Sequence, residues 1–86
     1  MPNIGSFNGI RIRMFFNDHP PPHFHARYGG FKATVDIGTR AIINGQLPAP
    51  ILNRVRKWAK INQAEPMQNW QRCQGKIQPT TIAPLP

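Results

Sequence analysis

Acidic residues are scarce in this sequence: Asp18, Asp36 and Glu65 are the only three among 86 residues. Eleven lysines and arginines outnumber them, so the formal net charge is +8 with the histidines neutral. Charged residues nevertheless make up only 16% of the chain, below the roughly 25% of an average domain. The basicity therefore reflects missing acids as much as added bases. Taken alone, it indicates an acidic partner less strongly than a dense basic patch would.

Cysteine, long apolar runs and a leader signature are also lacking. The single Cys73 excludes an internal disulfide and a Cys-x-x-Cys zinc motif. No apolar stretch approaches the ~18 residues of a membrane span, and the N-terminus lacks the basic-then-apolar pattern of a signal peptide. We therefore expect a cytoplasmic protein with a reduced thiol and no membrane partner.

The length of the chain allows one small domain. Hydrophobic residues make up 40% of it and include Trp58 and Trp70, which is enough for a small core. We expect a single domain over residues 1–75. Residues 76–86 hold three prolines and no periodicity, so we expect an extended or disordered tail. The sequence leaves open the oligomeric state, and whether this tail folds back or reaches into a partner.

Alternation of apolar and polar residues, typical of half-buried strands, runs through the first half of the chain. It predicts strands over 10–16, 23–28 and 31–37, and a shorter one over 40–43. Gly29-Gly30 predicts a tight hairpin between two of these strands. Residues 1–9 show no such pattern and are interpreted as a lead-in. Asn44-Gly45 is interpreted as a turn.

The period of the apolar residues changes after Leu47. Ile51, Val55 and Trp58 recur at helical spacing, and a second, shorter helix is predicted from Glu65 to a stop at Gly75. The order of elements predicts an α+β fold. In that fold, an antiparallel meander of three to four strands carries two C-terminal helices packed on one face.

The segment from Asp18 to His25 holds all three histidines of the chain. His23 and His25 are two residues apart on a predicted strand, so they project from the same face. The same polar face carries the cations Arg11, Arg13, Arg27 and Lys32. This combination favours RNA binding, because the cations can hold phosphate, and it is compatible with acid–base cleavage of RNA, because imidazoles titrate near neutrality. His23 and His25 would be the acid–base pair, with Asp18 orienting His19.

Two alternatives remain open for this segment. In the first, the histidines hold zinc or another transition metal through His19, His23 and His25, with Asp18 as a substitute for His19. In the second, the chain is a non-catalytic protein-interaction module and the histidine segment only shapes a turn. The preferred interpretation needs no cofactor.

Several short motifs occur in a familiar order: Gly9-Ile10-x-Ile12, Phe16-Asn17-Asp18-His19-x-Pro21-Pro22-His23-Phe24-His25-Ala26, Tyr28-Gly29-Gly30 and Asn69-Trp70. In these motifs the chain resembles the small bacterial proteins of domain-of-unknown-function family 4160, over nearly its whole length. That family has no settled catalytic assignment, so the resemblance transfers the positions of His19, His23 and His25 but no roles. Arg27 stands where an acid is common in the family.

The resemblance also implies a partner. Members of the family are often encoded next to a small protein of domain-of-unknown-function family 2442, in what looks like a toxin–antitoxin module with the present family in the toxin position. We therefore expect a small basic protein of toxin type that binds RNA through its His/Arg sheet face. Whether it also cleaves RNA stays open.

Overall fold

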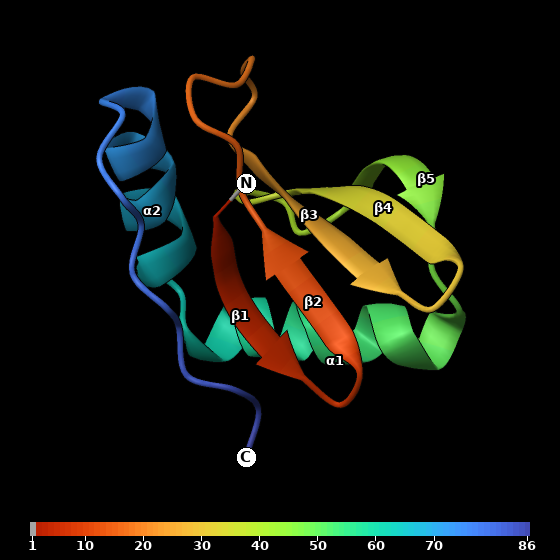
Figure 1. The fold of residues 1–86 in the computed structure, drawn as a ribbon. Helices are drawn as coiled ribbons and strands as arrows, with labels where there is room; N and C mark the ends of the chain where they lie inside the picture. Colours follow the sequence, from red (N-terminus) through yellow and green to blue (C-terminus); the bar gives the residue numbers. More distant parts are fainter. Residues whose placement is uncertain (1) are drawn as a thin grey trace.

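Five strands and two helices follow one another in the structure, a computed structural model that describes residues 2–86 (Figure 1). Met1 lies outside the described residues. The strands are β1 (Asn3–Phe7), β2 (Ile10–Arg13), β3 (His23–Tyr28), β4 (Phe31–Asp36) and β5 (Ile42–Gln46). They form one antiparallel sheet in the order β1-β2-β3-β4-β5, followed by α1 (Ala49–Ile61) and α2 (Glu65–Gln74). The α+β class is confirmed, and no helix within residues 2–86 is long and apolar enough to cross a membrane.

The expected three to four strands are too few, because the N-terminal segment forms strand β1. Ile4 and Gly5 are adjacent and both buried, and the register with β2 shifts between Asn3 and Gly5. Such a bulge interrupts the alternation by which a strand is recognised in a sequence. Asn8 and Gly9 close the β1–β2 hairpin with φ angles of 51° and 77°. Positive φ at both positions is what a type I′ two-residue hairpin turn requires.

Asn44-Gly45 lies inside β5 rather than in a turn. Asn44 is opposite Thr34 and Gly45 is opposite Ala33 of β4, and the register then shifts because Val35 pairs with Ile42, which leaves Ile43 of β5 as the extra residue. Gly45 has a φ of 79°, and a β-carbon there would collide with the backbone carbonyl of Lys32. Glycine is therefore needed here so that the two strands can approach closely. The sequence pattern alone does not distinguish such a glycine from one in a turn.

The core is centred on Trp58 of α1, which is fully buried. Its ring stacks on Phe7 of β1 at a centroid distance of 5.5 Å and meets Phe24 of β3 edge-on at 5.7 Å. Ile51 and Val55 of the same helix join this cluster. Helix α1 crosses behind the sheet (Figure 1). Burying each large apolar side chain contributes roughly 1.5–3 kcal/mol to folding stability. The face of the sheet that packs against α1 therefore stabilises the fold, and we expect the functional site on the opposite, open face.

The C-terminal segment, residues 76–86, has no regular secondary structure but folds back on the domain (Figure 1). Ile82 is buried, and its N–H donates to the carbonyl of Ile4 in β1. The fully buried Asn69 of α2 donates from Nδ2 to the Thr80 carbonyl at 2.7 Å and accepts the Thr80 N–H at 2.9 Å. Trp58 donates from Nε1 to the carbonyl of Ala83. The tail is therefore held by hydrogen bonds to both helices and to β1.

We expect Asn69→Ala to destabilise the protein by about 2 kcal/mol, because it leaves two Thr80 backbone groups without partners. For a domain of this size the melting temperature should fall by about 8–16 °C. Thermal unfolding followed by circular dichroism measures this shift. The control Gln68→Ala removes an adjacent amide that is exposed on the same helix. Equal melting temperatures for both variants would contradict a structural role of the Asn69–Thr80 pair.

Candidate nucleic-acid interface and histidine cluster

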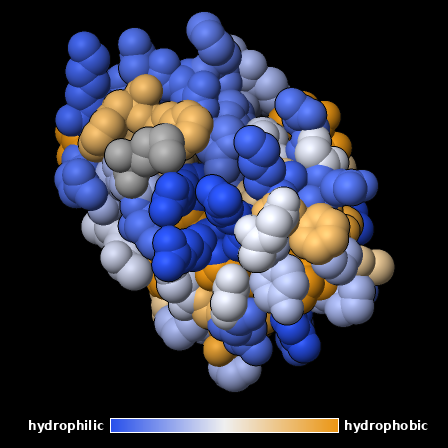
Figure 2. Space-filling model, turned by 45° about the vertical axis from the view of Figure 1, so that its right-hand side comes forward, coloured by the Kyte–Doolittle hydropathy of each residue, from blue (hydrophilic) through white to orange (hydrophobic). Residues whose placement is uncertain are grey.

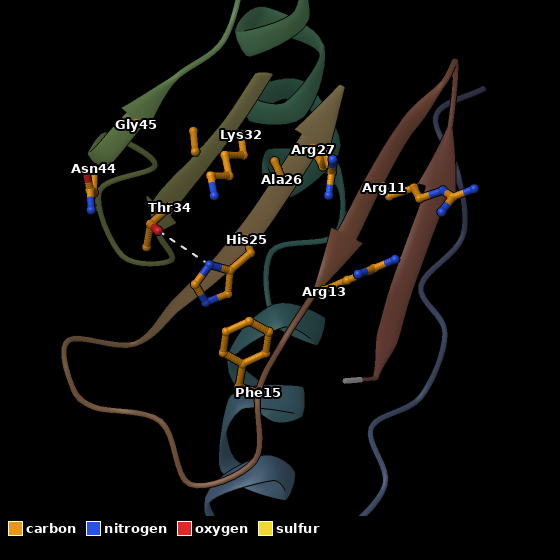
Figure 3. Close-up of a pocket in the computed structure, with 11 residues that line it drawn as sticks. Arg11, Arg13, Phe15, His25, Ala26, Arg27, Lys32, Thr34, Asn44 and Gly45 are labelled. Atoms are coloured by element: carbon orange, nitrogen blue, oxygen red, sulfur yellow. Dashed lines mark hydrogen bonds between the residues drawn. The ribbon is translucent and has the colours of Figure 1, made fainter. Parts of the chain in front are cut away.

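Three cations lie in direct register across the open face of the sheet. Arg11 of β2 is opposite Arg27 of β3, and Arg27 is opposite Lys32 of β4. Alternation along each strand turns their side chains away from α1 (Figure 3). Like charges directly opposite one another destabilise a sheet. The fold therefore accepts a repulsive row, here called the basic row, one residue pair from the β3–β4 turn.

A second row of polar residues runs parallel to the basic row. Arg13 of β2 is opposite His25 of β3, which is opposite Thr34 of β4, which in turn is opposite Asn44 of β5. Phe15 stacks on the His25 ring with a centroid distance of 4.3 Å and an interplanar angle of 21°. An aromatic surface thus lies beside the basic row.

The two rows line a cavity of about 410 Å³ on the open face. Strongly hydrophilic side chains gather near the middle of this face (Figure 2). The cavity is lined by Arg11, Arg13, Phe15, His25, Ala26, Arg27, Lys32, Ala33, Thr34, Asn44 and Gly45. No carboxylate is among them, so the cavity is a basic hollow with one aromatic wall.

The acids of the chain are engaged elsewhere. Within residues 2–86, both ion pairs shorter than 4.0 Å join Asp18 to a histidine. Asp36 accepts the backbone N–H of Thr39 at 2.8 Å, and Glu65 lies in the first turn of α2. The cations of the cavity therefore have no carboxylate partner in the described part of the chain.

Next to the cavity, Asp18 joins two histidines in what we call the histidine cluster: Asp18, His23 and His25. Oδ2 of Asp18 lies 2.9 Å from Nε2 of His23 and 3.4 Å from Nε2 of His25. Oδ1 accepts the backbone N–H of His19 at 2.8 Å, which orients the carboxylate. Within residues 2–86, this is the one group of three or more His, Cys, Asp or Glu side chains that could ligate a metal ion. Its ligand atoms all lie within 4.8 Å of one another.

Helix α2 positions this cluster from the far end of the sequence. The carbonyl of Cys73 accepts the N–H of Asn17, and Gln74 donates from Nε2 to the carbonyl of Asp18 at 2.9 Å. The ring of His23 packs on Trp70 at a centroid distance of 5.1 Å and is only 8% exposed. The loop that carries Asp18 and the strand that carries His23 are therefore both fixed against one helix.

Both ring nitrogens of His23 face oxygen atoms. Nδ1 lies 2.6 Å from the carbonyl of Pro21, which can only accept, so Nδ1 carries a hydrogen. Nε2 faces the carboxylate of Asp18. The side chain of His25 is 30% exposed, and its Nδ1 lies 3.4 Å from Oγ1 of Thr34. His23 is thus enclosed, whereas His25 reaches the cavity.

The structure brings together most, but not all, of the predicted site residues. Asp18, His23 and His25 form the histidine cluster, and all four predicted phosphate-binding cations line the cavity together with His25. His19 is exposed and contributes only its backbone N–H to Asp18. His25 is the residue that the cavity and the cluster share.

Three further residues of the cavity wall with polar or aromatic side chains are not among the predicted binding residues: Phe15, Thr34 and Asn44. Alternation along the strands carries a signal for Phe15 and Thr34, because both fall in phase with the polar face. The sequence gives no such signal for Asn44, because the pair Asn44-Gly45 is typical of a turn rather than of a strand. Asn44 reaches this face only because β5 continues through Gly45.

Burial of the carboxyl acts to raise the pKa of Asp18, but the backbone N–H of His19 and the rings of His25 and His23 outweigh it. The pKa of Asp18 is therefore lowered from its ordinary value. A lowered pKa in the folded state means that the ionised group stabilises the fold above the unfolded-state pKa. That contribution is lost as the pH falls through the folded-state value.

We expect Asp18→Asn to lower the stability at pH 7 by roughly 1 kcal/mol, because a charged acceptor of three hydrogen bonds is replaced by a neutral one. The gap to the wild type should shrink as the pH falls below about 4. Thermal unfolding in a chelating buffer at several pH values measures the gap. Glu65→Gln is the control, because it shows how the loss of an exposed carboxyl alone changes the stability. A gap for Asp18→Asn that stays constant down to pH 2 would contradict the assignment.

Comparison with protein-family models gives a match over residues 9–71, more than half of the chain, to the family described as Domain of unknown function (DUF4160). The matched range contains the whole cavity lining and the whole histidine cluster. No curated protein and no solved structure matches the chain. The chain therefore belongs to the DUF4160 family.

Proposed function

We propose that this protein binds single-stranded RNA on the open face of its sheet. The observation that carries the proposal is the basic row of Arg11, Arg27 and Lys32, three like charges in register that have no carboxylate partner within residues 2–86. The repulsion among them costs stability. A bound polyanion removes that cost and supplies favourable phosphate contacts.

The dimensions of the row favour a chain of phosphates over a single anion. Neighbouring strands lie about 4.8 Å apart, so the row spans about 10 Å from β2 to β4. A single phosphate group, with a charge of at most about −2, would leave part of the positive charge of such a row unneutralised. A phosphodiester backbone that crosses the strands contacts each cation in turn, and Arg13 adds a fourth at the edge of the cavity.

The aromatic wall favours unpaired bases. Phe15 and His25 are stacked with each other beside the cations, and an exposed base extends such a stack at about 1–3 kcal/mol per base. Thr34 and Asn44 offer hydroxyl and amide groups on the same face. Such groups can contact a 2′-hydroxyl, which distinguishes RNA from DNA.

The geometry supports binding better than cleavage. An acid–base pair needs two imidazoles that reach the same phosphodiester. His25 reaches the cavity, but His23 is packed on Trp70 with both ring nitrogens facing oxygen atoms. We therefore propose an RNA-binding protein without a cleavage step at this pair.

The role of toxin partner, together with a neighbouring protein of family 2442, stays a prediction. RNA binding by the open face supplies a physical means by which such a chain would act. On this proposal, the toxicity of overexpression depends on the basic row rather than on His23.

We expect wild-type protein to bind a fluorescently labelled single-stranded RNA with a log–log salt slope of about −2.8, for four phosphate contacts. That slope corresponds to about a 50-fold loss of affinity between 50 and 200 mM salt. The double variant Arg11→Gln/Arg27→Gln should reduce the slope to about −1.4, without lowering the melting temperature. Fluorescence anisotropy in a chelating buffer measures the affinity.

The matched control is Arg54→Gln/Lys57→Gln, which removes two exposed cations from α1. It lowers the net charge equally and should leave the slope close to that of the wild type. Equal losses from the two double variants would show that net charge, not this face, attracts RNA. Absence of RNA binding, together with a stable complex with an acidic protein, would favour the interaction-module alternative.

A further inference from the structure

We infer that Asp18, His23 and His25 form a binding site for one zinc ion, with Oδ2 of the carboxylate and Nε2 of each ring as ligands. This site adjoins the cavity but does not depend on RNA binding. It corresponds to the variant of the sequence-based ligand set in which Asp18 replaces His19, which is exposed.

The ligand atoms already converge. Two imidazole nitrogens approach the same carboxylate oxygen at 2.9 and 3.4 Å, and all three ligand atoms lie within 4.8 Å of one another. Zinc binds nitrogen and oxygen at about 2.0–2.2 Å, so ligands in a tetrahedral shell stand about 3.3 Å apart. The separations of 2.9 and 3.4 Å are already near this spacing, and no pair of ligand atoms has to close by more than about 1.5 Å.

The hydrogen bonding of His23 calls for a positive centre between its ring and Asp18. Nδ1 holds a hydrogen that it donates to the Pro21 carbonyl at 2.6 Å. In a neutral ring the lone pair of Nε2 then points at a carboxylate oxygen 2.9 Å away, which is repulsive unless a cation lies between them. A proton on Nε2 would supply this positive charge for His23 only, whereas a metal ion at the same place would also bind Nε2 of His25.

Each ligand has an outer partner of the kind found around metal sites. A metal-bound histidine usually donates its other ring N–H to a carbonyl or carboxylate, and a ligating carboxylate is itself hydrogen-bonded. Here the Pro21 carbonyl accepts from His23, and the His19 N–H donates to the second oxygen of Asp18. Oγ1 of Thr34 lies 3.4 Å from Nδ1 of His25.

Packing holds the two rings in place before a metal arrives. The His23 ring lies on Trp70, the His25 ring lies on Phe15, and the two rings meet edge to face at 5.1 Å and 84°. Two imidazoles and one carboxylate suit zinc, and three protein ligands leave one coordination position for water or an anion. The 30% exposure of the His25 side chain provides access from the cavity.

Zinc titration of untagged protein, after removal of metals with a chelator, tests the site. A chromophoric chelator that competes for zinc measures affinity, and thermal unfolding measures the effect on the fold. We expect one zinc per chain with micromolar or tighter affinity, and a rise in melting temperature of at least about 5 °C at saturating zinc. His25→Ala should weaken binding by at least about 100-fold and abolish the rise.

His19→Ala is the matched control, because it removes an exposed histidine close to the cluster. It should retain the affinity and stoichiometry of the wild type. Asp18→Asn preserves the shape of the side chain and should weaken zinc binding by at least about tenfold, which keeps the test valid if His25→Ala does not fold.

Three outcomes would overturn the site: no stoichiometric zinc, wild-type affinity in both His25→Ala and Asp18→Asn, or equal losses in His19→Ala and His25→Ala. The RNA measurement is made in a chelating buffer, so failure of the zinc site leaves its result unaffected.

Discussion

Trp58 is the side chain on which the sheet, α1 and the C-terminal tail all depend. Its ring contacts Phe7 and Phe24 on two strands, and its Nε1 donates to the carbonyl of Ala83 in the tail. A β-carbon on Gly5 would lie only 3.0 Å from the indole, so β1 can pass this close only with glycine there. One aromatic residue thus joins the two ends of the chain to its middle, on the face of the sheet that the cavity does not use.

The open face and the histidine cluster are two sites built on one strand. β3 supplies Arg27 to the basic row, His25 to the cavity wall, and His23 to the cluster under α2. Every second side chain along this strand is therefore more enclosed than the last: Arg27 is exposed, His25 lies in the cavity wall, and His23 is buried against Trp70. Any ligand that reorients His25 changes both sites, because its ring stacks on Phe15 and its Nε2 faces Asp18.

The regular parts of this fold could be predicted from the sequence, because periodicity reports directly on which face is buried. The alternation in β2, β3 and β4, and the helical spacing of Ile51, Val55 and Trp58, both correspond to elements of the structure. The bulge near Gly5 breaks the alternation in β1, and the close approach at Gly45 resembles a turn, so both edge strands were harder to recognise.

In the candidate site too, the features set by local alternation could be predicted from the sequence, and those set by distant contacts could not. Four cations could be assigned to one face because strand alternation is local. The enclosure of His23 depends on Trp70, which is 47 positions away along the chain, and no local pattern contains that contact. The choice of Asp18 over His19 depends on how the proline-rich loop turns and on the hydrogen bond from Gln74. Contacts between distant segments set the chemistry of the cluster.

The basic row has a consequence for the behaviour of the free protein in solution. At about 0.1 M salt the screening length is about 10 Å, comparable to the span of the row, so added ions relieve its internal repulsion. If RNA binds as proposed, the same ions would also compete with the bound polyanion. Ionic strength therefore acts on stability and on affinity with opposite sign. The ligand-free protein in dilute buffer is the form in which the sheet is under the greatest electrostatic strain, and a bound polyanion relieves that strain as added salt does.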